Sequence, residues 1–180
     1  YFMDYVKRFT DMPFLVRIEK DGEKFVPGRL MRVDETPNYK DVENGEWKFL
    51  NFDSKTGNLV SPMGTMGYRW QDKKGQWNLL FKDGETGVEY DPELTFLDKK
   101  DDVVQISYHD FGLAKDFKRG VPVRFVKDKQ GNDVPVATIY DLLMGHYGVN
   151  RGLEGDYPKS YDETDQAYTP AWQEIFTGID

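Results

Sequence analysis

Apolar and polar residues alternate most regularly within residues 46–90. Trp77, Leu79 and Phe81 are separated by polar residues, and residues 68–71 repeat the alternation, which is the period of a half-buried β-strand. The segments between these runs contain glycine in combinations that are typical of tight turns. Because rows of exposed tryptophan and phenylalanine are unfavourable in water, the aromatic face needs a cover. We therefore expect an antiparallel meander here, around which the rest of the chain is organised.

Shorter runs with a period of two predict additional strands. They comprise residues 14–19, 25–33, 104–108, 121–125 and 134–136. Pro27 and Gly28 interrupt the second run, which returns from the first through a Lys-Asp-Gly-Glu turn. The last two runs are joined by Lys129-Gln130-Gly131-Asn132, so they form the most clearly predicted hairpin of the chain.

The hydrophobic period changes to that of a helix after Thr138. Apolar residues recur at helical spacing through residues 139–147. Thr138 and Asp141 fit a capping box, in which each side chain bonds to the other residue's backbone amide. Gly148 fits the left-handed residue that commonly ends a helix.

Two other helices are predicted near the ends of the chain. Residues 1–9 place their aromatic residues and Val6 on one side. A short helix begins after Thr169 and ends at Gly178, with proline at its first position. Residues 91–97 predict one helical turn, and residues 36–45, which lack periodicity, predict a loop.

These elements predict an α+β fold that is mainly antiparallel meander and hairpins, with short helices at the N-terminus and in the C-terminal third. A chain of 180 residues fits one domain. We expect a helix end and linker at residues 1–13, a β-rich body at residues 14–137 and a helical part at residues 138–180. The sequence begins with Tyr1 rather than methionine and stops just after a predicted helix end, so we expect a fragment of a larger protein.

Composition excludes several classes of function. The net charge is −8 and the basic residues are scattered among acidic ones, which argues against nucleic-acid binding. Without cysteine there is no disulfide, no thiol nucleophile and no thiolate ligand for a metal. The sequence contains no apolar run of about 18 residues, so we expect no direct insertion into a membrane.

Candidate chemistry is sparse. His109 and His146 are far apart in sequence and no third metal ligand stands out, so we interpret both as structural or surface residues. Residues 128–133 resemble a calcium loop but lack the alternating ligands and the closing glutamate, so a hairpin turn is favoured. No Gly-x-Ser-x-Gly elbow or nucleotide-binding glycine fingerprint is present. We predict no catalytic and no metal-binding residue.

The tryptophans leave one binding function open. An exposed coplanar pair among Trp47, Trp70 and Trp77 would form a platform of the kind that β-rich modules use for sugars. Alternation places Trp77 on the same side as Leu79 and Phe81, which favours a core role for it. A free-standing, aromatic-rich binding module for carbohydrate or protein is therefore the alternative hypothesis.

Several longer motifs resemble one enzyme family. The chain is similar along its length to the catalytic alpha subunit of respiratory, membrane-bound nitrate reductase, within the molybdopterin oxidoreductases. The motifs are Phe9-Thr10-Asp11-Met12-Pro13-Phe14-Leu15-Val16, Gly28-Arg29-Leu30-Met31-Arg32, Gly67-Tyr68-Arg69-Trp70, Gly75-Gln76-Trp77-Asn78-Leu79, Thr138-Ile139-Tyr140-Asp141-Leu142, Tyr147-Gly148-Val149-Asn150-Arg151-Gly152-Leu153 and Ala167-Tyr168-Thr169-Pro170-Ala171-Trp172.

The resemblance implies a parent enzyme that reduces nitrate to nitrite in anaerobic respiration. Such an alpha subunit holds a molybdenum bis(molybdopterin guanine dinucleotide) cofactor and a 4Fe-4S cluster. It receives electrons through an iron–sulfur beta subunit from a membrane gamma subunit, at the cytoplasmic face of the cell membrane. The family's cluster ligands and its molybdenum-ligating aspartate lie upstream of the matched region, so none is carried over.

The segment itself is then expected to be structural, to bind no cofactor and to be inactive alone. Arg29, Arg32, Arg69 and Arg151 recur within the matched motifs. They would contact cofactor phosphates or a neighbouring subunit, because arginine suits bidentate recognition of anions. Surface ion pairing is the interpretation that we prefer for them.

Overall fold

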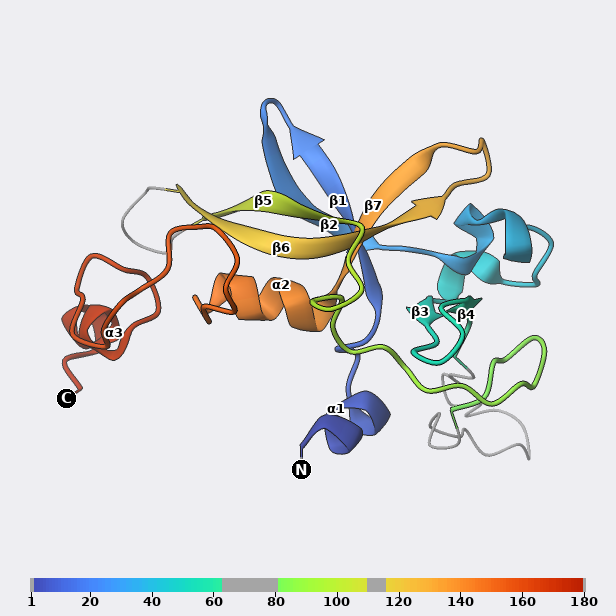
Figure 1. The fold of residues 1–180 in the computed structure, drawn as a ribbon, viewed down its shortest axis with the longest axis horizontal. Coiled ribbons are helices and arrows are strands. Elements are labelled where there is room, and N and C mark those ends of the chain that lie inside the picture. The colour runs from blue at the N-terminus through green and yellow to red at the C-terminus, as the bar shows by residue number, and fades with distance from the viewer. Residues whose placement is uncertain (1, 63–80, 110–115, 180) are drawn as a thin grey trace.

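The centre of the molecule is a closed five-stranded β-barrel (Figure 1). The computed structural model describes residues 2–62, 81–109 and 116–179. In the order of their neighbours, the barrel strands are β1 (Leu15–Asp21), β2 (Lys24–Leu30), β5 (Asp102–His109), β6 (Asp116–Lys127) and β7 (Asp133–Thr138). The predicted strands outside residues 46–90 are thus present, although β2 ends at Leu30 and not at Val33, which begins a 3₁₀ helix. The mixture of helices and strands agrees with the α+β class.

Strand pairing follows the barrel rather than a meander. β1 pairs with both β2 and β7, and β6 pairs with both β5 and β7, all in antiparallel fashion. β2 meets β5 in parallel at one position, Phe25 opposite Ile106. The expected predominance of an antiparallel meander is therefore not confirmed. Alternation identifies the faces of a strand but not its neighbours, so this closure was not evident in the sequence.

The described parts of the predicted organising stretch, residues 46–62 and 81–90, lie beside the barrel. Within residues 46–90 the structure describes only two very short strands, β3 (Asn51–Phe52) and β4 (Leu59–Val60), which pair as a separate two-stranded sheet. The aromatic runs around Trp70 and Trp77 fall outside the described residues. The barrel, not this stretch, is the element around which the described chain is arranged.

Two apolar clusters lie on opposite faces of the barrel strands. Leu15 belongs to one cluster and Val16 to the other, because successive residues of a strand point to opposite faces. Val136 and Ala137 of β7 divide in the same way. The first cluster also includes Ile106, Tyr108, Phe117, Val121, Leu142 and Trp172. The second includes Met31, Leu50, Phe52, Phe96 and Val126.

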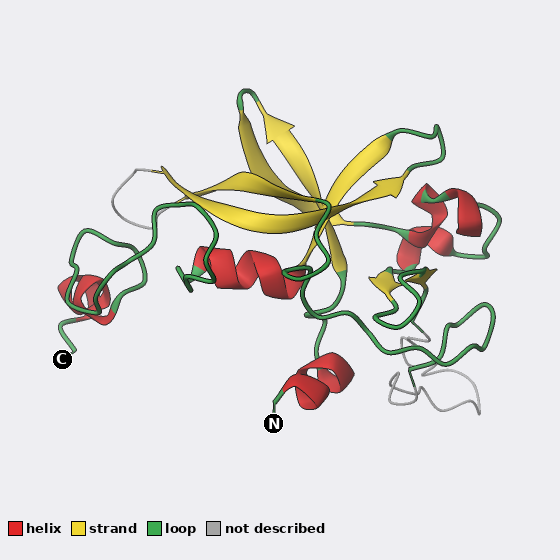
Figure 2. Cartoon of the chain, in the orientation of Figure 1, coloured by secondary structure: helices red, strands yellow, loops and turns green. Residues whose placement is uncertain are grey.

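The α-helices of the described residues are short and lie outside the strands (Figure 2): α1 (Met3–Phe9), α2 (Ile139–His146) and α3 (Pro170–Thr177). All three predicted helices are thus present. The Thr169 hydroxyl accepts a hydrogen bond from the backbone of the first turn of α3, at 3.1 Å. Gly178 ends α3 with a left-handed backbone, φ 64°, as expected from its lack of a Cβ atom.

Helix α2 packs against β6 and β7 and begins with the predicted cap. Thr138 Oγ1 accepts a hydrogen bond from the Asp141 amide at 3.0 Å. The second half of the predicted capping box is wrong, because the Asp141 carboxylate points elsewhere. It accepts hydrogen bonds from Thr95 Oγ1 (2.5 Å), Arg151 Nη1 (2.6 Å) and the backbone amide of Phe96 (2.8 Å). We refer to these four residues as the Asp141 network.

The helical turn predicted at residues 91–97 is absent. Pro92 instead pairs with Asp53 in an isolated β-bridge. The amide of Glu93 bonds to the Phe52 carbonyl, at 2.8 Å, and the amide of Phe96 bonds to Asp141. Since these amides are used in tertiary contacts, they are not available for helical hydrogen bonds.

The loop predicted at residues 36–45 contains more local structure than expected. The 3₁₀ helix η2 (Pro37–Tyr39) lies within it, η1 (Val33–Glu35) ends just before it and η3 (Gly45–Trp47) begins at its last residue. Such turns are too short to give a hydrophobic period, which explains why the sequence pattern indicated an irregular segment.

Candidate functional site

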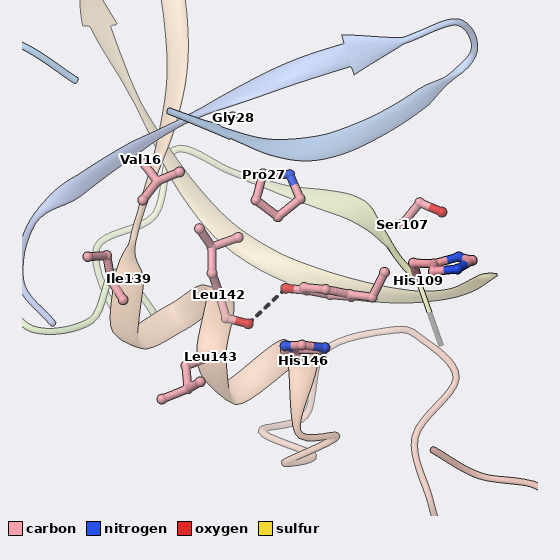
Figure 3. A pocket seen from close by; sticks show the side chains of 10 residues that line it. Val16, Pro27, Gly28, Ser107, His109, Ile139, Leu142, Leu143 and His146 are labelled. Atoms are coloured by element: carbon pink, nitrogen blue, oxygen red, sulfur yellow. Dashed lines mark hydrogen bonds between the residues drawn. The ribbon is translucent and has the colours of Figure 1, made fainter. Parts of the chain in front are cut away.

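An apolar groove of about 550 Å³ separates the β1–β2 hairpin from helix α2 (Figure 3). On this side of the barrel, β2 and β5 pair at only one position, Phe25 opposite Ile106. Proline at position 27 has no amide proton with which β2 could extend this pairing. The lining residues are Val16, Pro27, Gly28, Ser107, Tyr108, His109, Ile139, Leu142, Leu143 and His146.

The polar groups of the groove are mostly bonded to the protein itself. The hydroxyl of Tyr108 donates to the Leu142 carbonyl at 2.9 Å (Figure 3). The imidazole of His146 stacks almost parallel on Tyr108, with ring centroids 5.2 Å apart, and its Nε2 lies 2.8 Å from the Tyr168 hydroxyl. Burial, followed by the positive charge of Arg119, lowers the pKa of His146. The groove therefore presents a neutral imidazole in apolar surroundings.

A charged cluster lies at the mouth of the groove, on the paired ends of β5 and β6. Asp116 bonds to Lys24, to His109 Nδ1 at 3.2 Å and to the Ser107 hydroxyl at 3.3 Å. Ser107 donates to the carboxylate rather than to an imidazole. The cluster is therefore a salt-bridged network and not a Ser-His-Asp relay, in which the serine contacts the histidine.

Asp116 makes one pH effect predictable. The hydrogen bonds from Lys24 and then from His109 lower the pKa of its carboxyl from 3.8 to about 2. A carboxyl with a lowered pKa stabilises the fold above its unfolded pKa and loses that contribution as pH falls through the folded value. We expect the urea midpoint of Asp116→Asn to lie below that of the native chain at pH 5 and the difference to shrink as pH falls from there through about 2. A constant difference over this range would contradict the assignment.

The two histidines lie in different surroundings. His109 is exposed and pairs with Asp116, whereas His146 packs among aromatic rings. Across residues 2–62, 81–109 and 116–179, no three His, Cys, Asp or Glu residues are close enough to hold a metal ion. Residues 128–133 form the hairpin turn between β6 and β7, in which Asp128 Oδ1 accepts hydrogen bonds from the amides of Gln130 and Asn132.

The recurrent arginines differ from one another. Arg29 makes the expected surface ion pair, with Glu35 at 2.5 Å. Arg32 instead places its guanidinium 4.4 Å from the centre of the Phe49 ring. For Arg151 the surface interpretation is wrong, because it bonds to a carboxylate that is completely buried. Arg69 lies outside the described residues.

The structure describes only one of the three tryptophans that were considered for a sugar-binding platform. Trp47 is exposed, whereas Trp70 and Trp77 lie outside the described residues. Trp172 packs in the core between Tyr168 and Phe176, with ring centroids 5.1 and 4.9 Å away.

Apolar side chains are uncovered at both ends of the described chain. On α1, Phe2 and Phe9 are 78% and 50% exposed. On α3, Ile175 and Phe176 are 64% and 51% exposed, although Trp172 is buried. Of the aromatic side chains at the two ends, Phe2, Phe9 and Phe176 are thus at least half exposed. Such apolar surfaces are typical of regions that contact another part of a protein assembly.

Sequence reasoning missed three groupings of side chains. The Asp141 network was missed because a capping box explained Asp141 locally. The Asp116 cluster had one partial signal: Ser107 lies on the strand predicted at residues 104–108 and His109 directly follows that strand, so the two would share a face if the strand continued by one residue. Nothing in the sequence indicated that Tyr168 would meet His146.

None of the described helices is long and apolar enough to cross a membrane.

No family model matches the chain. Curated relatives match 99% of it. It is 36% identical over 192 residues to the respiratory nitrate reductase 1 alpha chain of Escherichia coli (strain K12), and it covers 15% of that protein. It is 35% identical over 180 residues to the nitrate reductase alpha chain of Bacillus subtilis (strain 168), and 37% identical over 185 residues to the nitrate reductase alpha subunit of Mycobacterium tuberculosis (strain ATCC 25618 / H37Rv), with 14% of each covered.

Proposed function

We propose that this chain, which is homologous over nearly its whole length to one part of nitrate reductase alpha chains, acts as a structural segment of such a subunit. The observation that carries the proposal is continuous similarity along 99% of the chain, at 35–37% identity. The chain spans only 14–15% of the length of these relatives. The activity of the whole subunit therefore belongs to a larger protein.

The whole subunit is proposed to reduce nitrate to nitrite in anaerobic respiration. When bound, a molybdenum bis(molybdopterin guanine dinucleotide) centre supplies the oxygen-atom transfer and a 4Fe-4S cluster supplies electron transfer. An iron–sulfur beta subunit and a membrane gamma subunit are its proposed partners, and the cytoplasmic face of the cell membrane is its proposed location.

Within residues 2–62, 81–109 and 116–179, the candidate residues do not fit a role as ligands of those groups. The sequence has no cysteine to hold an iron–sulfur cluster. Arg29 and Arg151, which would suit cofactor phosphates, are engaged by Glu35 and Asp141. We therefore assign no step of nitrate reduction to this chain.

The contribution of the segment is proposed to be packing. The barrel supplies a rigid body, and the exposed apolar residues of α1 and α3 face outward from it. Contact with the remainder of the alpha subunit would remove these side chains from water, which is favourable at about 25 cal/mol for each Å² of apolar surface buried.

A chimaera tests the proposal. These residues would replace the matched segment of the Escherichia coli respiratory nitrate reductase 1 alpha chain, in cells without other nitrate reductases. We expect anaerobic nitrite formation by the chimaera and none by this chain alone, because the segment provides structure and not chemistry. Nitrite formation would be measured in cell suspensions, with the alpha chain lacking the matched segment as control.

Two outcomes would contradict the proposal. One is a chimaera that accumulates to the native level yet forms no nitrite. The other is nitrite formation by the purified chain, since that would require a reaction centre within it.

A further inference from the structure

Tyr168 and His146 form a hydrogen-bonded pair that the proposed structural role does not use. The phenol oxygen lies 2.8 Å from Nε2, and the rings meet edge to face with centroids 4.7 Å apart. Tyr168 has a left-handed backbone, φ 69°, which is uncommon for a residue with a large side chain. Such a conformation persists only where the surroundings hold it, so the position of this phenol is well determined.

The pair lies within a continuous series of aromatic rings. Tyr108, buried beside the groove, stacks on His146 with centroids 5.2 Å apart. Trp172 lies 5.1 Å from Tyr168 on the other side. Tyr147, which is half exposed, is 5.8 Å from both His146 and Tyr168. The series therefore connects a buried tyrosine to the surface of the molecule.

The hydrogen-bond partners distinguish Tyr168 from Tyr108 and Trp172, the other two buried or half-buried oxidisable rings that flank the pair. The Tyr108 hydroxyl donates to the Leu142 carbonyl, which is a poor acceptor for a whole proton. Within the described part of the chain, Trp172 Nε1 is buried without a hydrogen-bond partner. Tyr168 has an imidazole at its hydroxyl, and with the imidazole proton on Nδ1, Nε2 is free to accept.

We propose that Tyr168 and His146 form a proton-coupled redox pair that traps an oxidising equivalent delivered by a one-electron oxidant, such as an oxygen-derived radical. Tyr168 gives one electron to the oxidant, directly or through the neighbouring rings. Its phenolic proton moves to His146 Nε2, which leaves a neutral phenoxyl radical and an imidazolium. A small-molecule thiolate then gives one electron to the phenoxyl radical and becomes a thiyl radical, and the imidazolium returns its proton to the phenol oxygen. This inference does not depend on the proposed function.

The wild-type protein provides the first test. Ruthenium(III) tris-bipyridine, generated by light with persulfate as electron acceptor, would oxidise it in the presence of a nitroso spin trap. Mass spectrometry would then locate the trapped adducts. We expect at least roughly tenfold more adduct on Tyr168 than on Tyr161, because a positioned base contributes about 10²–10⁴-fold to a proton-transfer step. Tyr161 is the reference because it is 79% exposed.

The same measurement in urea needs no variant. Unfolding separates Tyr168 from His146, so the preference for Tyr168 should disappear. Adduct yields that follow exposure in the native protein, with Tyr161 above Tyr168, would overturn the proposal. Identical profiles in native buffer and in urea would overturn it as well.

A variant of His146 then distinguishes its role as proton acceptor from its role as an aromatic ring in the series. His146→Phe keeps an aromatic ring beside Tyr108 but removes the acceptor nitrogen, so the adduct on Tyr168 should fall to the level on Tyr161. Tyr161→Phe is the matched control, and it should leave the yield on Tyr168 unchanged. A full yield on Tyr168 in a folded His146→Phe protein, as judged by near-UV circular dichroism, would show that the imidazole takes no part.

Discussion

Replacing Asp141 with alanine will lower the free energy of unfolding by about 3–5 kcal/mol, the range for removing one partner of a buried ion pair. The Asp141 side chain is completely buried and that of Arg151 is 14% exposed. The substitution leaves this guanidinium and the amide of Phe96 without the acceptor that both share. Urea unfolding followed by circular dichroism measures the loss.

An exposed ion pair provides the matched control. Lys127 Nζ lies 2.9 Å from Asp133 Oδ2 on the surface of the β6–β7 hairpin, with both side chains more than half exposed. Asp133→Ala should cost less than about 1 kcal/mol, because water already solvates both charges. Equal losses in Asp141→Ala and Asp133→Ala would contradict the importance assigned to burial. Adding Arg151→Met to Asp141→Ala should recover part of the stability, since it removes the stranded charge.

Gly148→Ala is expected to lower the free energy of unfolding by about 2–5 kcal/mol. The backbone of Gly148 is left-handed, φ 73°, which costs a residue with a Cβ atom about 1–2 kcal/mol. The new Cβ atom would also lie 2.8 Å from Pro158 Cδ and 2.9 Å from Arg119 Nη1. Overpacking of this kind adds about 1–3 kcal/mol. Thermal and urea unfolding both measure the effect.

Gly152→Ala separates the two causes. Gly152 has nearly the same backbone, φ 79°, but no atom lies within 4 Å of the position that its Cβ would occupy. This variant should therefore show the backbone cost alone, about 1–2 kcal/mol. If Gly148→Ala lowered the free energy of unfolding no more than Gly152→Ala, the side chains of Pro158 and Arg119 would have moved away from the new Cβ atom at no energetic cost.

Local sequence patterns predicted the elements whose structure is determined locally. The cap at Thr169 and the end at Gly178 depend on residues within the helix itself, and both are confirmed. The hairpin at residues 121–136 was equally clear, because its turn and its alternation adjoin one another. The resemblance to nitrate reductase alpha chains came from motifs spread along the chain, and the comparisons bear it out.

Contacts between distant residues explain what was missed. The pairing of Phe25 with Ile106 closes the barrel between residues that are 81 positions apart in the sequence. The pattern of neither segment indicates that the other is its partner. Asp141 fitted a local cap, and only the fold shows that its carboxylate turns toward Thr95 and Arg151. The pair of His146 and Tyr168 likewise requires the chain to return to α2 after a long loop.

Helix α2 is only eight residues long, and a helix of that length does not persist alone in water. Hydrogen bonds of the Asp141 network hold its first turn. Arg119 holds its last turn, because Nη1 donates hydrogen bonds to the carbonyls of Gly145 (2.9 Å) and His146 (2.7 Å). We therefore expect its amide protons to exchange with deuterium mainly when the hydrogen bonds of the Asp141 network or of Arg119 break. Slow hydrogen exchange in α2 would therefore show that the segments carrying Thr95, Arg151 and Arg119 remain bound to the helix.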